Sequence, residues 1–464
     1  MCFRGFLCFS LSFLIFSPAA WALESPSAKI EDDSALRRSI IPSWFKESPG
    51  VVLAAKSFLH TLPGGSRIEV RSESRGNEFS IILARELLTG AEGRKTGEFP
   101  GWAQGSWALT RNKTDGSPLH IRVFPGRDPY VYVQFRSLGG GKSQMDVVAY
   151  DSYLVQSHPV PLNFDRIMEI PMEEVYRNAG IAFPRRYFDP LPALYKDTIT
   201  LVEKIRVALP SLSFRDDGAL DDQGRYVFIN TLESQDGKGG LNCSGFAKWV
   251  VDGMLRPYTG TLLPIEPLKQ AFGKRGSSFT EPYEALRDPF FGLDWTRNLA
   301  SRAMGTLLSP AFAEVEEFEV RRAPIGAVID RRKDAPVYVK PYPGFLLNAG
   351  FGVEGLQALL YTLAIDEPGR IYLASVNNEI NDPNNRPLPP GREGKVPYRM
   401  RQHFHIAVLI PYFNEYGIFR IAVFESAEET AFIRFKNRYP GHYVNLVRIP
   451  VEGVFDPAPP LAAR

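Results

Sequence analysis

Cysteine is scarce in this chain of 464 residues, which contains only three. Cys2 and Cys8 lie within residues 1–22, where a positive residue, an apolar run and a small-x-small site follow one another as in a secretory signal peptide. We expect this segment to be removed, so that the mature chain keeps one thiol, Cys243. A single thiol cannot form an intramolecular disulfide, so it is either a buried apolar residue or a nucleophile.

Other features are missing as well, and each absence excludes a class of protein. After residue 22 no apolar run is long enough to span a membrane. No Cys/His spacing resembles a metal site and no glycine-rich loop resembles a nucleotide cradle, so we expect no cofactor. The net charge of +2 is spread along the chain and does not indicate a nucleic-acid partner. The signal predicts export to the periplasm or cell envelope.

The organisation of the chain predicts an α+β fold. Residues 67–155 alternate apolar and polar positions in short runs, with Asp115-Gly116 and Gly139-Gly140-Gly141 as hairpin turns. With a preceding helix at 51–62, this indicates an antiparallel β-rich domain over residues 23–157. Residues 158–193 form a connector with a short helix near 172–178. Residues 194–464 combine helices with a late cluster of strands. We expect these helices at 194–209, 246–254, 296–308 and 353–363, and these strands at 371–376, 403–411, 418–424 and 443–449.

The surroundings of Cys243 favour a nucleophile. Asn242 is a good N-cap residue, and apolar residues at helical spacing follow, so Cys243 is expected in the first turn of a helix. The unpaired amides and the helix dipole stabilise a thiolate there. The small Ser244 and Gly245 leave room for a substrate carbonyl near those amides.

A cysteine nucleophile needs a base, and the chain has only six histidines. His60 is expected to end a helix, whereas His403 and His405 share an otherwise apolar strand in the same half as Cys243. Being two residues apart, they are expected on one face of that strand. In a hairpin with the next strand, Glu425 lies near the start of the histidine strand, where a carboxylate orients an imidazole. A core histidine and an exposed strand-end carboxylate are the alternative interpretations.

These residues resemble the NlpC-type cysteine peptidases, compact papain-like enzymes that cut bacterial cell-wall peptides. Asn-Cys-Ser-Gly-Phe-Ala at 242–247 is similar to the start of that family's catalytic helix, and His-Ile-Ala-Val-Leu at 405–409 is similar to its histidine strand. The resemblance implies His405 as the base, with His403 beside it, and Glu425 as the third polar residue. Asn242 and Arg370 stand where the family usually has aspartate.

The resemblance covers residues 194–450 and implies a large insertion at about 255–351, because Cys243 and His405 are unusually far apart. Tyr226 is the nearest candidate for the family's tyrosine at the oxyanion site. The implied function is hydrolysis of amide bonds in peptidoglycan stem peptides by Cys243, His405 and Glu425, without metal or organic cofactor. Two alternatives stay open: an acyltransferase or thioesterase acting on lipid-like groups, and an inactive envelope scaffold.

Overall fold

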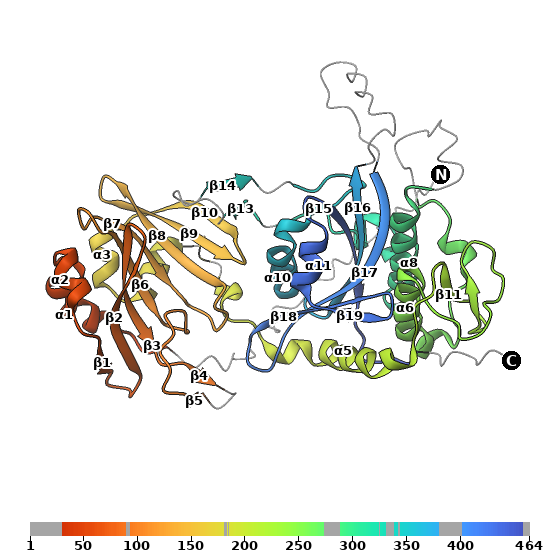
Figure 1. The fold of residues 1–464 in the computed structure, drawn as a ribbon, viewed down its shortest axis with the longest axis horizontal. Helices are drawn as coiled ribbons and strands as arrows, with labels where there is room; N and C mark the ends of the chain where they lie inside the picture. The colour runs from red at the N-terminus through yellow and green to blue at the C-terminus, as the bar shows by residue number, and fades with distance from the viewer. Residues whose placement is uncertain are drawn as a thin grey trace, which may run out of the picture.

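The computed structural model describes residues 30–89, 93–180, 183, 185–272, 288–323, 325–330, 338–341, 344–379 and 401–457. The predicted signal peptide lies outside these ranges. Within them the chain forms two units, each built around an antiparallel sheet, and the predicted α+β class is confirmed (Figure 1). No helix in the described ranges is both long and apolar enough to cross a bilayer.

The first unit is an antiparallel sheet whose strands follow chain order almost throughout. In spatial order its described strands are β1 (Phe58–Thr61), β2 (Arg67–Arg75), β3 (Glu78–Arg85), β6 (Trp107–Asn112), β7 (Pro118–Val123), β8 (Val131–Gly139), β9 (Lys142–Ala149), β10 (Ser152–Val160), β13 (Ala327–Asp330) and β14 (Tyr338–Pro341). The short hairpin β4 (Leu88–Thr89) and β5 (Arg94–Lys95) lies beside it. Gly116 (φ 70°) turns the chain between β6 and β7, and Gly139–Gly141, all at positive φ, turn it between β8 and β9, as predicted.

The predicted helix at residues 51–62 is wrong in its second half. Helix α2 (Pro49–Ala54) ends early, after α1 (Ser34–Ile40), and the following residues form the edge strand β1, in which His60 pairs with Ile68. The chain reverses at Gly65 (φ 87°), which allows β1 to pair with β2. Sheet pairing therefore overrides the local helical spacing here.

The predicted connector, residues 158–193, is built into the first unit. Its helices α3 (Phe164–Glu169) and α4 (Met172–Ala179) contribute buried side chains to the core of that unit. The buried guanidinium of Arg37 donates hydrogen bonds to the carbonyls of Ile167, Met168 and Ile170. These bonds satisfy carbonyl groups at the end of α3 and fix the segment against α1.

The second unit contains a six-stranded antiparallel sheet among the described residues. Its strands, in spatial order, are β15 (Phe351–Gly352), β20 (Tyr443–Pro450), β16 (Arg370–Glu379), β17 (Arg401–Phe413), β18 (Phe419–Glu425) and β19 (Glu428–Thr430). The remaining elements are α5 (Lys196–Ala208), β11 (Gly218–Leu220), β12 (Tyr226–Phe228), α6 (Cys243–Thr259), α8 (Phe291–Leu307), α9 (Val315–Phe318), α10 (Leu356–Asp366) and α11 (Phe432–Arg438). The four late strands and four helices predicted for this half are all present, with shifted ends.

Strand alternation gives this second sheet two buried faces. Leu373 and Val408 pack with the apolar side chains of α6 and α8, whereas Tyr372 and Leu409 belong to the cluster that includes α10. Because both faces are covered, β16 and β17 are almost continuously apolar. The predicted insertion, residues 255–351, contributes elements to both units. Helix α8 covers one face of the second sheet, and β13 and β14 extend the sheet of the first unit.

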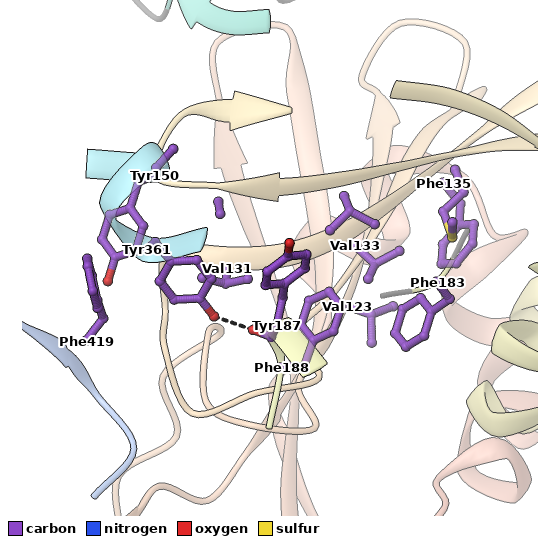
Figure 2. Close-up of a cluster of buried hydrophobic side chains, with 14 of the residues drawn as sticks. Val123, Val131, Val133, Phe135, Tyr150, Phe183, Tyr187, Phe188, Tyr361 and Phe419 are labelled. Atoms are coloured by element: carbon purple, nitrogen blue, oxygen red, sulfur yellow. Dashed lines mark hydrogen bonds between the residues drawn. The ribbon is translucent and has the colours of Figure 1, made fainter. Parts of the chain in front are cut away.

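The two units are joined by an aromatic cluster (Figure 2). Tyr361 of α10 packs against Tyr150, which follows β9, and against Phe419 of β18, with ring centroids 5.5 and 5.2 Å away. The Tyr361 hydroxyl donates a hydrogen bond to the carbonyl of Tyr187. Asp128 of the first unit accepts a hydrogen bond from Tyr150 at 2.5 Å and one from the Phe419 amide at 3.4 Å. The units therefore share one buried core.

Candidate active site

Cys243 is the first residue of α6, as the sequence predicts. The Asn242 side chain caps the helix by accepting a hydrogen bond from the Gly245 amide at 2.8 Å. The amides of the first turn have no acceptor inside the helix, and the positive end of the helix dipole lies at the sulfur. This position favours a negative charge on Cys243 and on any oxyanion formed beside it.

A close approach between α6 and β11 fixes this first turn. The Asn242 amide donates to the Gly218 carbonyl at 2.9 Å. A Cβ atom at Gly245 would lie 2.0 Å from the same carbonyl oxygen, so only glycine fits there. The buried Trp295 of α8 donates through Nε1 to the Ser244 carbonyl at 3.0 Å. Contacts from two elements therefore hold the cysteine in place.

His405 and Glu425 meet at the end of the β17–β18 hairpin, as predicted. His405 Nε2 lies 2.7 Å from Glu425 Oε2. Burial lowers the pKa of His405, but hydrogen bonds to Cys243 and Glu425 outweigh burial and raise this pKa to about 9. Burial raises the pKa of Glu425, but the hydrogen bonds from His405 and Thr430 outweigh burial and lower this pKa to about 2. Both groups are therefore charged near neutral pH.

The sulfur of Cys243 lies beside this pair. Burial raises the pKa of the thiol, but the hydrogen bond and charge of His405, the Ile406 amide and the Ser244 hydroxyl together lower it below its ordinary value. Since Glu425 occupies Nε2 of His405, the ring presents Nδ1 to the sulfur. The arrangement suits a thiolate–imidazolium pair with a carboxylate behind the imidazolium.

Glu425 is itself held by residues that the sequence did not indicate. Thr430 of β19 donates to Glu425 Oε1 at 2.7 Å, and Arg438 at the end of α11 lies 2.6 Å from the same oxygen. The turn between β18 and β19 places Ser426 and Ala427 at φ 50° and 67°. Two-residue hairpin turns of this kind usually contain Asn or Gly, so no sequence signal marked this hairpin.

Aromatic side chains flank His405 on the α11 side. The Tyr439 ring centroid lies 5.8 Å from that of His405. Burial raises the pKa of Tyr439, and the charge of Cys243 also acts to raise it. Phe404 is 41% exposed and lies 5.9 Å from Tyr439 and 5.7 Å from His442. An exposed phenylalanine next to the histidine provides an apolar surface at the edge of the site.

The predicted shared face of His403 and His405 is wrong. A β-bulge pairs Val376 with His405 but Asn377 with His403, so that the two histidines face opposite sides of the sheet. His403 is buried, with Nδ1 2.8 Å from Ser375 Oγ and Nε2 2.9 Å from the Asn348 carbonyl. Burial lowers its pKa to about 3, so His403 is a neutral core residue on the α8 side.

Ser244 and Tyr226, the other predicted site residues, have smaller roles in the arrangement. Ser244 Oγ is 4.0 Å from the sulfur. Tyr226 of β12 packs tightly against Gly239, where an added Cβ would meet its ring at 2.2 Å, and it belongs to the apolar cluster that borders Cys243. Throughout the described part of the chain no hydrogen bond joins Tyr226 to the sulfur. Among the described residues no group of three His, Cys, Asp or Glu could hold a metal ion.

Comparison with known proteins gives one match. Residues 26–187 match the model of a family described as a domain of unknown function, DUF8515. The matched segment covers the first unit as far as Tyr187 and ends before α5, so it excludes Cys243, His405 and Glu425. No curated protein matches the chain significantly. No solved structure matches it either.

Proposed function

We propose that the protein is an exported bacterial cysteine peptidase or amidase of NlpC-like, papain-like architecture, acting on peptidoglycan stem peptides. The observation that carries the catalytic part is the Cys243–His405–Glu425 arrangement at the N-terminus of α6, with 2.7 Å between His405 and Glu425. The substrate part is supported by the resemblance of residues 242–247 and 405–409 to that family. Export is supported by residues 1–22, which lie outside the described ranges.

In this proposal the Cys243 thiolate attacks the carbonyl carbon of the scissile amide. First-turn amides of α6 stabilise the oxyanion. The amide C–N bond breaks as His405 donates its proton to the leaving amine, and an acyl-thioester remains on Cys243. His405 then takes a proton from water, which attacks the thioester and releases the acid. Glu425 keeps the ring orientation and stabilises its charged form throughout.

The direct test is a digest of purified sacculi with the wild-type protein and with Cys243→Ala, followed by mass spectrometry of the released fragments. We expect new peptide termini only with the intact thiol. A His405→Ala variant should be equally inactive, whereas His60→Ala, in β1 of the first unit, serves as the matched histidine control and should keep full activity. Equal fragments from wild type and folded Cys243→Ala would exclude a thiol peptidase. Acid release from acyl esters without peptide cleavage would favour the acyl-transfer alternative.

A further inference from the structure

A cavity lies where the first unit meets the β17–β18 hairpin. It has a volume of about 810 Å³, and residues of the β4–β5 region, the segment before β8 and the start of β18 line it. In Figure 1 this is the region where β4 and β5 approach the loop before β18. The volume is typical of a small-molecule or oligomer binding site.

This cavity is remote from the thiol. Arg420, which lines it, pairs with Tyr412 near the end of β17, whereas His405 lies near the start of that strand. Seven residues at roughly 3.4 Å each separate His405 from Tyr412 by about 24 Å along the strand. A ligand in the cavity therefore does not contact the Cys243 site.

Three arginines from separate elements give the cavity a positive lining. Arg94 comes from β5, Arg127 from the segment before β8 and Arg420 from β18. Within the described ranges none of the three is in a salt bridge, and Arg127 makes only a 3.4 Å hydrogen bond to the Tyr416 carbonyl. Guanidinium groups converging on a cavity are the usual protein partners of carboxylate and phosphate oxygens.

Three carboxylates also line the cavity, those of Glu31, Glu86 and Asp128. Glu86 forms a salt bridge with Arg67 and accepts a hydrogen bond from the Gly97 amide at 3.0 Å. Asp128 accepts from the Tyr150 hydroxyl and from the Tyr130 amide at 3.0 Å. Glu31 accepts a hydrogen bond from the Gly64 amide, and its charge acts on Arg85. Arg94, Arg127 and Arg420, which have no salt bridge among the described residues, therefore carry the positive charge that a ligand could meet.

Arg85 supplies an independent sign of a missing ligand. It lines the same cavity and its side chain is buried, at 6% exposure. Among the residues that the structure describes, its Nη1 has no hydrogen-bond partner. Nη2 donates to the Glu31 carbonyl at 2.8 Å, and the carboxylates of Asp33, Glu31 and Asp32 act on the guanidinium by charge, without a salt bridge among the described residues. A buried N–H group without an acceptor is unfavourable, and an anionic oxygen in the cavity would satisfy it.

Aromatic rings complete the lining. Trp102, Tyr130 and Tyr416 are 42%, 58% and 41% exposed, so each ring offers accessible surface to a ligand. One face of Tyr130 stacks on Tyr150, with ring centroids 5.4 Å apart. Such rings combine an apolar face with a polar tip and suit the apolar faces of sugar rings. Gln104 and Thr89 add neutral groups that exchange hydrogen bonds with hydroxyls.

We propose that this cavity binds an acidic saccharide, with its carboxylates held by Arg85, Arg127 and Arg420 and its rings against the exposed aromatic side chains. The alternation of arginines with open rings favours a sugar chain over a single inorganic anion, because an anion would leave the rings uncovered. The site is separate from the thiol, so it does not depend on the proposed peptidase activity.

The test is calorimetric titration of the full mature protein with a hexamer of galacturonic acid, using maltohexaose as the neutral control. We expect the acidic hexamer to bind at least about tenfold more tightly than the neutral one. Arg127→Gln and Arg420→Gln should each weaken binding by about tenfold or more. Arg302→Gln, an exposed arginine on α8, is the matched control and should bind as wild type. Unchanged thermal unfolding shows that the variants are folded.

Several results would overturn this assignment. Equal affinity for the neutral hexamer would show that the arginines do not recognise the ligand. Equal effects of Arg302→Gln and Arg420→Gln would show that the ligand does not bind in the cavity. Tighter binding of inorganic phosphate or ATP than of the hexamer would reassign the site to a phosphate ligand. Cys243→Ala should bind the hexamer as wild type, so that a failure of the proposed peptidase function is distinguishable from a failure of this site.

Discussion

At the scale of single residues, the site depends on how charge is shared among Cys243, His405 and Glu425. The pKa of the thiol is lowered and that of His405 is raised to about 9, so the thiolate–imidazolium pair is populated between the pKa of the thiol and that of His405. Below the pKa of the thiol the thiolate is protonated, and above the pKa of His405 the imidazolium loses its proton. Activity should therefore rise from acid, reach a plateau and fall near pH 9, with both limbs belonging to the coupled pair.

Glu425→Gln tests the carboxylate behind the imidazolium. Without that charge the pKa of His405 falls, so the alkaline limb of kcat/KM should move to lower pH by about 1 unit or more. The measurement is the pH profile of peptide hydrolysis. Glu428→Gln, an exposed carboxylate on β19, is the matched control and should leave the profile in place. An alkaline limb that stays at pH 9 in Glu425→Gln would show that Glu425 does not act on His405.

The two strand histidines should behave differently on substitution. His405→Ala removes the thiolate's partner, so alkylation of Cys243 by iodoacetamide near neutral pH should slow by about tenfold or more. His403→Ala should leave the alkylation rate unchanged but lower the free energy of unfolding by about 2–4 kcal/mol, because it opens a cavity and removes the hydrogen bonds of His403 with Ser375 and the Asn348 carbonyl. Slower alkylation in folded His403→Ala than in His405→Ala would contradict these assignments.

Sequence reasoning reached the positions of Asn242, Cys243, His405 and Glu425 because helix capping and strand periodicity are local signals. It could not place His403, since one bulged residue reverses the face of every side chain beyond it. The contact of Tyr439 with His405 was not predicted either, because it depends on how α11 packs and not on a local pattern. Spacing along the chain thus predicts pairs within one hairpin better than contacts between elements.

At the scale of elements, the junction of α6 with β11 controls the geometry of the thiol. A methyl group at Gly245 would overlap the backbone oxygen of Gly218, which cannot move away as a flexible side chain can. The helix start and its cysteine must shift if a larger residue is placed there. The junction therefore links the stability of α6 to the position of Cys243.

Gly245→Ala should lower the free energy of unfolding by about 2 kcal/mol or more and reduce turnover, because overpacking forces the backbone apart. Gly305→Ala on α8 is the matched control: its Cβ would make only an ordinary contact of 3.6 Å with Ala313, so it should be neutral or stabilising by about 0.5–1 kcal/mol. Urea denaturation of both variants compares them. Equal stability of the two would refute the close approach at Gly245.

Element prediction succeeded where a segment has a strong and long pattern. The strands around 371–376 and 403–411 are apolar on both faces and were identified with shifted ends only. Residues 58–61 have no such pattern and became an edge strand by pairing with β2 instead of continuing a helix. Where the local sequence pattern is weak, pairing with a distant strand determines the secondary structure, and the local sequence does not show that pairing.

At the scale of the whole molecule, the two units are one folded body because they share aromatic side chains. Tyr361 is buried between Tyr150, Tyr187 and Phe419 (Figure 2). The return of β13 to pair with β10 adds a second connection between the halves of the chain. Nothing in the sequence indicated this return, because β13 lies in the segment interpreted as an insertion.

Substitution of Tyr361 measures this coupling. Tyr361→Ala should lower the free energy of unfolding by about 3–5 kcal/mol through the cavity that it leaves. Tyr361→Phe keeps the ring and should cost only about 1 kcal/mol, for the lost hydrogen bond to the Tyr187 carbonyl. Tyr258→Phe, at an exposed position of α6, is the control and should change nothing. Guanidinium denaturation of the three variants would contradict the shared core if Tyr361→Ala were as stable as Tyr258→Phe.

The central claim is that Cys243 is an ionised nucleophile paired with His405. It is tested most directly by following thiolate absorbance during a pH titration of the mature protein, with Cys243→Ser subtracted as background. We predict that the thiolate forms below the ordinary thiol pKa of about 8.5 and that His405→Ala moves the transition upward. Ionisation at or above the ordinary value, unchanged in His405→Ala, would contradict it.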